Sequence, residues 1–187
     1  NMISKNFKIR TFTSLALLLL LLLMFNFDIV LVFSLLVLST YSLQEFFSIT
    51  QKIFQKKLYN AIVNLMFIIY VSVFCILFFL TTIFFELKLI LFVILVGCIF
   101  SDIGGFIAGK IFKGPKLTNI SPNKTISGAI GSLFFTCSIM SFLFFNFTGK
   151  LSLKIFIVSV FTSLFCQLGD LFFSYLKRKA KIKDTGN

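Results

Sequence analysis

The chain contains no histidine and no tryptophan, and only two of its 187 residues are proline. Without histidine, the printed sequence offers neither histidine metal ligands nor a histidine general base. Acidic residues are also scarce: six Asp and Glu stand against 18 Lys and Arg, a formal net charge of +12. The four cysteines fall one to an apolar run and match no disulfide or zinc spacing, so we interpret them as small apolar packing residues.

Hydrophobic residues dominate the rest of the sequence. They make up 58% of the chain, 29 of them phenylalanine, and the mean hydropathy is +1.04. Charged residues account for 13%, about half of the usual share, and cluster between long apolar runs. This composition excludes a water-soluble globular protein. It predicts an all-α, polytopic helical membrane protein that forms a single domain over residues 1–187.

Six apolar segments are long enough to cross the roughly 30 Å hydrocarbon core of a bilayer as helices. The predicted spans are roughly 11–27, 29–47, 60–82, 87–108, 124–147 and 153–176. The first follows three cations, as a secretory signal does, but no small-residue cleavage site comes after it, which favours a retained span. The alternative is to merge the first two spans into one long tilted helix.

Lysine and arginine are distributed unevenly between the loops. With six spans, fifteen of them fall at the N-terminus, in the 48–59 and 109–124 segments and in the tail, against three on the opposite side. Because positive residues concentrate on the cytosolic side of membrane proteins, both termini are predicted to be cytosolic. Merging the first two spans would place the N-terminal cations across the membrane from the 48–59 segment, so the hairpin is preferred.

Two of the acidic residues, Asp102 and Asp170, lie within apolar helices towards the predicted cytosolic side. An ionised residue inside a span costs at least about 2.5–3.5 kcal/mol on insertion scales, which makes each of them a functional candidate. A buried acid satisfied by a Lys or Ser of a neighbouring helix is the structural alternative. Asp28, Glu45 and Glu86 fall near span ends and are interpreted as solvated or interfacial groups.

Four glycines lie near the ends of two neighbouring spans. Gly105 and Gly109 are four residues apart, and Gly128 and Gly131 are three apart. Small residues at such spacings permit close helix packing, although the spacing alone is weak evidence.

The 109–128 segment contains both prolines of the chain. Ser121 and Pro122 fit an N-cap followed by proline at the first helical position, which predicts that the fifth span begins here. The first helical turn would then offer free backbone amides beside Lys124 and Thr125, a suitable environment for a phosphate. An ordinary basic loop attracted to anionic lipid is the alternative.

The C-terminal tail combines cations with carboxylates. Asp170 lies in the last apolar run, and five cations and Asp184 follow it: Lys177, Arg178, Lys179, Lys181 and Lys183. A stop-transfer signal would explain the cations but neither acid.

Two segments together resemble the phosphatidate cytidylyltransferase (CDP-diacylglycerol synthase) family. The family's C-terminal signature, S-x-(apolar)-K-R-x4-K-D followed by a small residue, is matched from Ser174 to Gly186, with Gly169 and Asp170 leading into it. Upstream, SDIGGFIAGKIFKGPKL and ISPNKTISGAIG are similar to the family's aspartate-containing helix end and its S-P-x-K-T-x-x-G segment. The resemblance covers roughly residues 97–187.

The resemblance implies transfer of a cytidylyl group from CTP to phosphatidate, giving CDP-diacylglycerol and pyrophosphate, with Mg²⁺ as cofactor. It assigns Asp170, with Asp102, as metal ligand. The implied catalytic residues are Asp102, Lys124, Asp170 and Asp184, and the implied substrate contacts are Ser121, Asn123, Thr125, Lys177, Arg178 and Lys183. Further expected features are a location in the bacterial inner membrane, a cytosolic active site and no nucleic-acid partner; a homodimer is left open.

In the family, the signature continues into a His-Gly-Gly segment and an Asp-Arg pair, and an aspartate there shares the metal. The printed chain stops at Asn187, before either, so the resemblance predicts that it is C-terminally incomplete and that this fragment is inactive alone. Two other functions stay open: a CTP-dependent polyprenol or dolichol kinase, and a small ion-coupled transporter that uses the intramembrane acids as ion sites.

Overall fold

The computed structural model of the chain describes residue 16 and residues 19–118, 121 and 124–182. Within these residues the structure is helical, apart from turns and an isolated bridge between Lys116 and Thr125. A helical segment at 19–26 precedes the longer helices. These are α2 (Asp28–Ile53), α3 (Lys57–Ile83), α4 (Phe85–Phe112), α5 (Ile126–Thr148) and α6 (Leu153–Lys179).

Five helices, α2 to α6, are long and apolar enough to cross a membrane. They confirm the all-helical, multi-pass architecture and the second to sixth predicted spans. The first predicted span, 11–27, is helical at residue 16 and over 19–26, and much of its N-terminal part lies outside the described residues. Both α2 and α4 run past their predicted ends, because Lys and Gln continue a helix readily beyond the apolar run.

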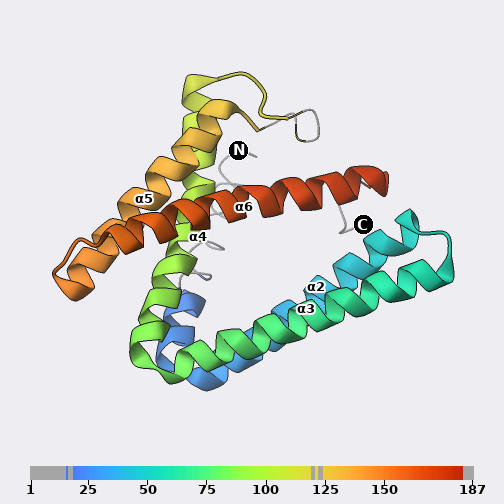
Figure 1. The fold of residues 1–187 in the computed structure, drawn as a ribbon, viewed down its shortest axis with the longest axis horizontal. Helices are drawn as coiled ribbons and strands as arrows, with labels where there is room; N and C mark the ends of the chain where they lie inside the picture. The colour runs from blue at the N-terminus through green and yellow to red at the C-terminus, as the bar shows by residue number, and fades with distance from the viewer. Residues whose placement is uncertain (1–15, 17–18, 119–120, 122–123, 183–187) are drawn as a thin grey trace, which may run out of the picture.

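Helix α4 stands at the centre of the molecule (Figure 1). Helix α5 returns along it, and α6 crosses it. Helices α2 and α3 lie side by side as a hairpin, which a short turn at Phe84 joins to α4. The contact between α4 and α5 is the most extensive in the structure.

Glycines allow α4 and α5 to approach this closely. A Cβ atom added to Gly128 would lie 2.9 Å from the carbonyl oxygen of Gly105, and one added to Gly104 would lie 2.7 Å from that of Gly131. Across the same interface, the Ser132 hydroxyl donates to the backbone carbonyl of Ser101 at 2.7 Å. The glycine spacings in the sequence therefore do reflect close helix packing, and the two partner helices are α4 and α5.

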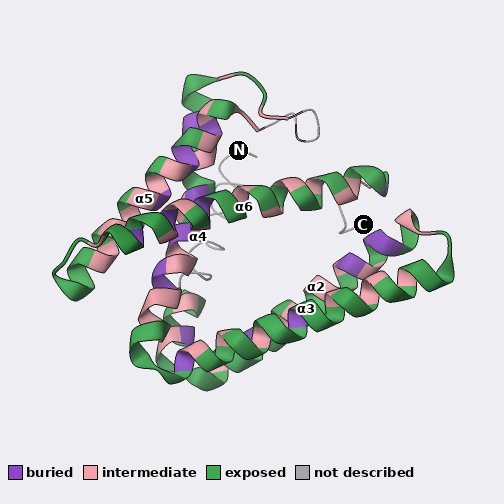
Figure 2. Cartoon of the chain, in the orientation of Figure 1, coloured by how far each residue is buried: buried purple, intermediate pink, exposed green. Residues whose placement is uncertain are grey.

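Most apolar side chains point outwards. Figure 2 shows buried residues where α4, α5 and α6 meet and along α2, with exposed residues over much of the remaining surface. In α3, only Val71 and Thr82 are buried. An apolar surface of this extent is incompatible with water and fits helices that face lipid.

Candidate active site

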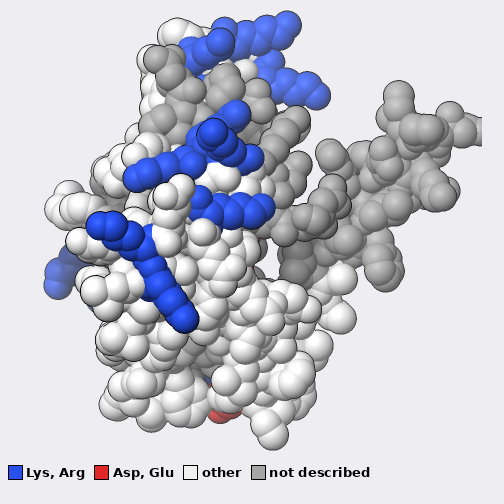
Figure 3. Space-filling model, turned by 90° about the vertical axis from the view of Figure 1, so that its right-hand side faces the viewer, with Lys and Arg blue, Asp and Glu red and all other residues white. Residues whose placement is uncertain are grey.

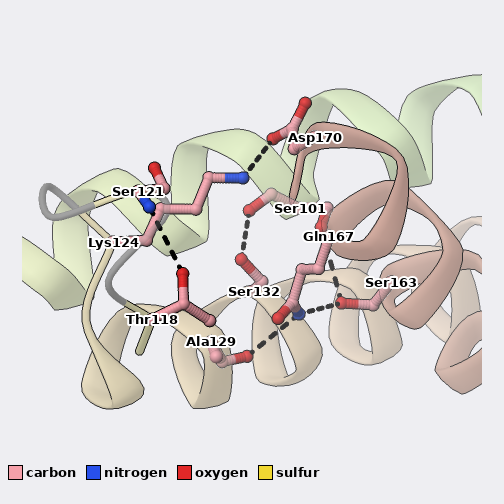
Figure 4. Close-up of polar contacts among 9 residues, drawn as sticks. All are labelled: Ser101, Thr118, Ser121, Lys124, Ala129, Ser132, Ser163, Gln167 and Asp170. Carbon is pink, nitrogen blue, oxygen red and sulfur yellow. Dashed lines mark hydrogen bonds and ion pairs between the residues drawn. The ribbon is translucent and has the colours of Figure 1, made fainter. Parts of the chain in front are cut away.

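A cavity of about 300 Å³ lies where α4, α5 and α6 meet the segment before α5. Polar and charged side chains from all three helices and from that segment line it. They are Ser101, Asp102, Lys110, Lys124, Thr125, Ser132, Gln167 and Asp170. Figure 4 shows several of these residues and their hydrogen bonds.

Asp170 and Lys124 form an ion pair inside this cavity. The Lys124 Nζ atom lies 2.8 Å from Asp170 Oδ2, although 46 residues separate them in the sequence (Figure 4). Asp102 lines the same cavity from α4 and interacts electrostatically with both residues. The structure thus brings both intramembrane acids and Lys124 to one cavity, as the sequence predicted, while their functional roles stay a prediction.

The two carboxylates are accessible rather than enclosed. The Asp170 side chain is 57% exposed, and Asp102 is also an exposed residue. The structural alternative was a buried acid neutralised by a neighbouring lysine. The structure has the neighbouring lysine, but the Asp170 carboxylate is exposed and faces an open cavity that a ligand can enter.

The backbone before α5 holds Lys124 in place. The Leu117 amide donates to the Lys124 carbonyl at 2.8 Å, and the Ile126 amide donates to the Pro115 carbonyl at 3.0 Å. This short antiparallel pairing begins shortly after α4, whose C-cap, Lys113, adopts the left-handed conformation with φ of 42°. Lys124 thus projects from a paired strand-like segment rather than from a helix.

The predicted start of the fifth span at Ser121 is wrong. Helix α5 begins at Ile126, and its N-cap is Thr125, whose hydroxyl accepts from the Gly128 amide at 3.1 Å. The helix starts later than predicted because the Lys124 carbonyl and the Ile126 amide are engaged in the backbone pairing with Leu117 and Pro115. The Ser121 amide instead donates to Thr118 Oγ1 at 3.3 Å (Figure 4). Asn123 and Pro122 lie outside the described residues.

This shift also revises the predicted phosphate site at the helix N-terminus. The Ile126 and Gly128 amides already donate to protein oxygens. The Ser127 hydroxyl, in turn, accepts from the Gly114 amide at 3.2 Å. The first turn of α5 therefore has fewer free backbone amides than the sequence suggested. The positive charge that could attract an anion comes mainly from Lys124 and Lys110 in the cavity wall.

Sequence reasoning missed Gln167. Its Nε2 atom donates to the Ala129 carbonyl and to Ser163 Oγ, each at 3.2 Å, and so ties α6 to the first turn of α5 (Figure 4). Ser163 also contacts Ser101 Oγ at 3.4 Å across the α4–α6 crossing. The available signal was an uncharged polar residue three positions before Asp170 in an apolar run.

The tail cations that the structure describes, up to Lys181, do not line this cavity. Lys177 lies further along α6 and forms an ion pair with Glu45 of α2 at 2.9 Å, and Arg178 is exposed. Glu45 was interpreted from the sequence as a solvated or interfacial group, whereas in the structure it forms an ion pair that joins α2 to α6. Lys183 and Asp184 lie outside the described residues.

The cavity also suits a magnesium ion. In the part of the chain that the structure describes, no group of three or more potential Cys, Asp or Glu ligands is positioned to hold a metal. Magnesium, however, usually takes one or two carboxylates and completes its shell with substrate phosphates and water. Asp102 and Asp170, both exposed to one cavity, meet that requirement.

These features define a class: a multi-pass helical membrane protein with two carboxylates and lysines in a cavity suited to phosphate groups. The family model described as the cytidylyltransferase family matches residues 2–187, and the chain belongs to this family.

Three curated relatives are named phosphatidate cytidylyltransferase. The Helicobacter pylori protein (strain ATCC 700392 / 26695) is 40% identical over 96 residues, covering 50% of this chain and 35% of its own. The Rickettsia felis protein is 38% identical over 105 residues (51% and 46%), and the Staphylococcus aureus protein (strain COL) is 41% identical over 90 residues (46% and 34%). The match thus covers less than half of each relative. No solved structure matches the chain significantly.

Proposed function

We propose that the protein transfers a cytidylyl group from CTP to phosphatidate, giving CDP-diacylglycerol and pyrophosphate. The observation that carries the proposal is the convergence of Asp102, Lys124 and Asp170 on one cavity in a chain of the cytidylyltransferase family. The curated relatives bear the name of the enzyme that performs this reaction.

In the proposed reaction, an oxygen of the phosphatidate phosphate attacks the α-phosphorus of CTP. A new P–O bond forms, the bond to the β-phosphate oxygen breaks, and pyrophosphate leaves. Such transfers depend on positioning and charge neutralisation rather than on covalent catalysis by the protein. A phosphate monoester has a second pKa near 6 and is largely ionised at neutral pH, so the absence of histidine is no obstacle.

The residues of the cavity have separate roles in this scheme. Lys124, which the paired backbone of the preceding segment positions, neutralises phosphate oxygens and must exchange its contact with Asp170 for one with the substrate. Asp170 and Asp102 would hold Mg²⁺, which would supply charge neutralisation on the transferring phosphate. Thr125 lines the cavity beside Lys124, whereas Ser121 is not one of the residues that line it.

The orientation in the membrane is also part of the proposal. Figure 3 shows Lys and Arg gathered over much of the face seen from the right of Figure 1, with mostly white surface and a small acidic patch below them. This grouping supports a cytosolic location for that face and for the active site. We propose the same side for both termini, from the distribution of Lys and Arg in the sequence. We propose the bacterial inner membrane, where CTP from the cytosol can meet a lipid phosphate at the interface.

Turnover of α-³²P-labelled CTP by the full-length protein, with phosphatidate and Mg²⁺ in mixed micelles, tests this function. We expect labelled CDP-diacylglycerol and equimolar pyrophosphate, and about 10²–10³-fold slower formation of labelled lipid by Asp170→Asn. Phosphorylation of a polyprenol, with unlabelled lipid product and release of labelled CDP, would instead establish a CTP-dependent kinase. If neither lipid is converted, the proposed function is refuted.

A further inference from the structure

A second cavity, of about 290 Å³, lies between the α2–α3 hairpin and α6. Its walls are mainly apolar side chains of α2 and α3, among them Leu35, Val71 and Phe74. Helix α6 contributes Phe173. The proposed reaction assigns no role to this cavity.

Helix α6 connects the two cavities. Phe173 follows Asp170 by three residues and precedes Lys177 by four, so all three lie on one side of the helix. At 1.5 Å per residue, Phe173 is about 4.5 Å from Asp170 along the helix axis and about 6 Å from Lys177. The apolar cavity therefore begins about one turn from a carboxylate of the candidate active site.

An ion pair lies at the other end of the apolar cavity. Lys177 reaches across to Glu45 of α2 at 2.9 Å, and Glu45 follows the cavity-lining residue Ser42 by three positions on its helix. Further exposed cations surround this end, three near the α2–α3 turn and three beyond Lys177. They are Lys52, Lys56, Lys57, Arg178, Lys179 and Lys181.

This combination matches the chemistry of one kind of molecule. Lys110 and Lys124 in the first cavity favour an anionic head there, and the apolar walls of the second cavity favour a hydrocarbon chain. A phosphate placed near Lys124 and Asp170 is separated from the apolar cavity by about one helical turn. A lipid with a phosphate head can therefore reach both cavities at once.

We propose that the cavity between α2, α3 and α6 holds an acyl chain of the phosphatidate substrate while its phosphate occupies the candidate active site. The inference rests on the proposed function. Because the bilayer is as apolar as the cavity, the cavity orients the lipid rather than adding hydrophobic affinity. Filling the cavity should consequently impair use of phosphatidate and leave CTP binding intact.

The first test compares a cavity-filling variant, Ser42→Phe, with a matched control on the same helix, Leu36→Phe, whose side chain is exposed and outside the cavity. In the full-length protein, we expect Ser42→Phe to lower kcat/KM for dioleoyl phosphatidate about tenfold, the low end of what a misfit of one methylene costs in a hydrophobic pocket. KM for CTP and turnover of dihexanoyl phosphatidate should stay as in the wild type, and Leu36→Phe should behave as the wild type. An unchanged kcat/KM for dioleoyl phosphatidate in a folded Ser42→Phe protein refutes the inference while the function stands.

The second test needs neither a variant nor turnover. Phosphatidate with a diazirine in the middle of one acyl chain is bound to the wild-type protein without CTP and irradiated, and the cross-linked peptides are identified by mass spectrometry. We expect labelling concentrated within 35–42 and 67–75, and competition by unlabelled phosphatidate. Uniform labelling of all lipid-facing helices, or labelling that an excess of phosphatidylcholine removes equally well, contradicts the inference. A wild-type protein that labels as expected but does not convert phosphatidate would refute the function alone.

Discussion

Substitution of Gly131 by alanine tests whether the close approach of α4 and α5 positions the candidate site. A Cβ atom at Gly131 would lie 2.8 Å from the Gly104 carbonyl oxygen, whereas ordinary van der Waals contact begins at 3.4 Å. It would also overlap the Ala108 Cβ atom. Neither neighbour is a flexible side chain, so the helices themselves must move apart by more than half an ångström.

Two effects of different size should follow from this movement. Overpacking of this kind typically costs about 1–3 kcal/mol of stability. The larger effect should be on catalysis, because Asp102 is on α4 while the segment carrying Lys124 leads directly into α5. A misplacement of about 1 Å between catalytic groups can cost about a hundredfold in rate, and we expect a loss of about ten- to a hundredfold in kcat.

The assay combines thermal unfolding in detergent with CTP turnover by the full-length protein. Gly169→Ala is the matched control, because a Cβ atom there meets no atom within 4 Å and the residue is close to Asp170 in sequence. We expect the control to keep its unfolding temperature and kcat, and Gly131→Ala to lose both. Wild-type values for Gly131→Ala would show that the close α4–α5 contact does not hold the site together, and the reasoning would be wrong.

Three further substitutions separate catalysis from stability. Asp170→Asn should lower kcat about 10²–10³-fold, as loss of a group that stabilises charge does. Its unfolding temperature should stay near that of the wild type, since the side chain is 57% exposed, and a large drop would indicate a structural role. Thr125→Val removes the N-cap of α5 and should cost about 1 kcal/mol in thermal unfolding, with Thr125→Ser retaining stability; equal losses would exclude capping. Glu45→Gln breaks a half-exposed ion pair with Lys177 and should change stability by less than about 1 kcal/mol, an effect that vanishes at high salt; a larger, salt-independent loss would contradict the assignment.

Local features of the sequence predict much of the helical plan. Runs of apolar residues longer than a bilayer crossing predict helices wherever they occur, and the second to sixth spans are found as expected. The boundaries are less well predicted. Lys52 and Lys110 follow the apolar runs, yet both lie inside helices. Lysine interrupts an apolar run but has a high helix propensity, so the helix continues through it.

The candidate site shows where local reasoning stops. Asp102 and Asp170 were identifiable because a charge inside a span is costly and therefore informative. The N-cap of α5 was misplaced because Ser121 and Pro122 form a good local signal, which the pairing of Leu117 with Lys124 overrides. Such pairing depends on residues on both sides of a turn and on where α4 ends.

The sequence by itself determined the class of the protein. It specified the membrane-spanning helices, the two functional candidates Asp102 and Asp170 within them, and the family to which the chain belongs. Tertiary structure alone decided which groups meet. The ion pair of Lys124 with Asp170, the bridge from Gln167 to α5 and the contact of Lys177 with Glu45 join residues 38 to 132 positions apart. Helix periodicity specifies which face a residue occupies, but the partner of that face is decided by packing, here by how closely the glycines let α4 and α5 approach.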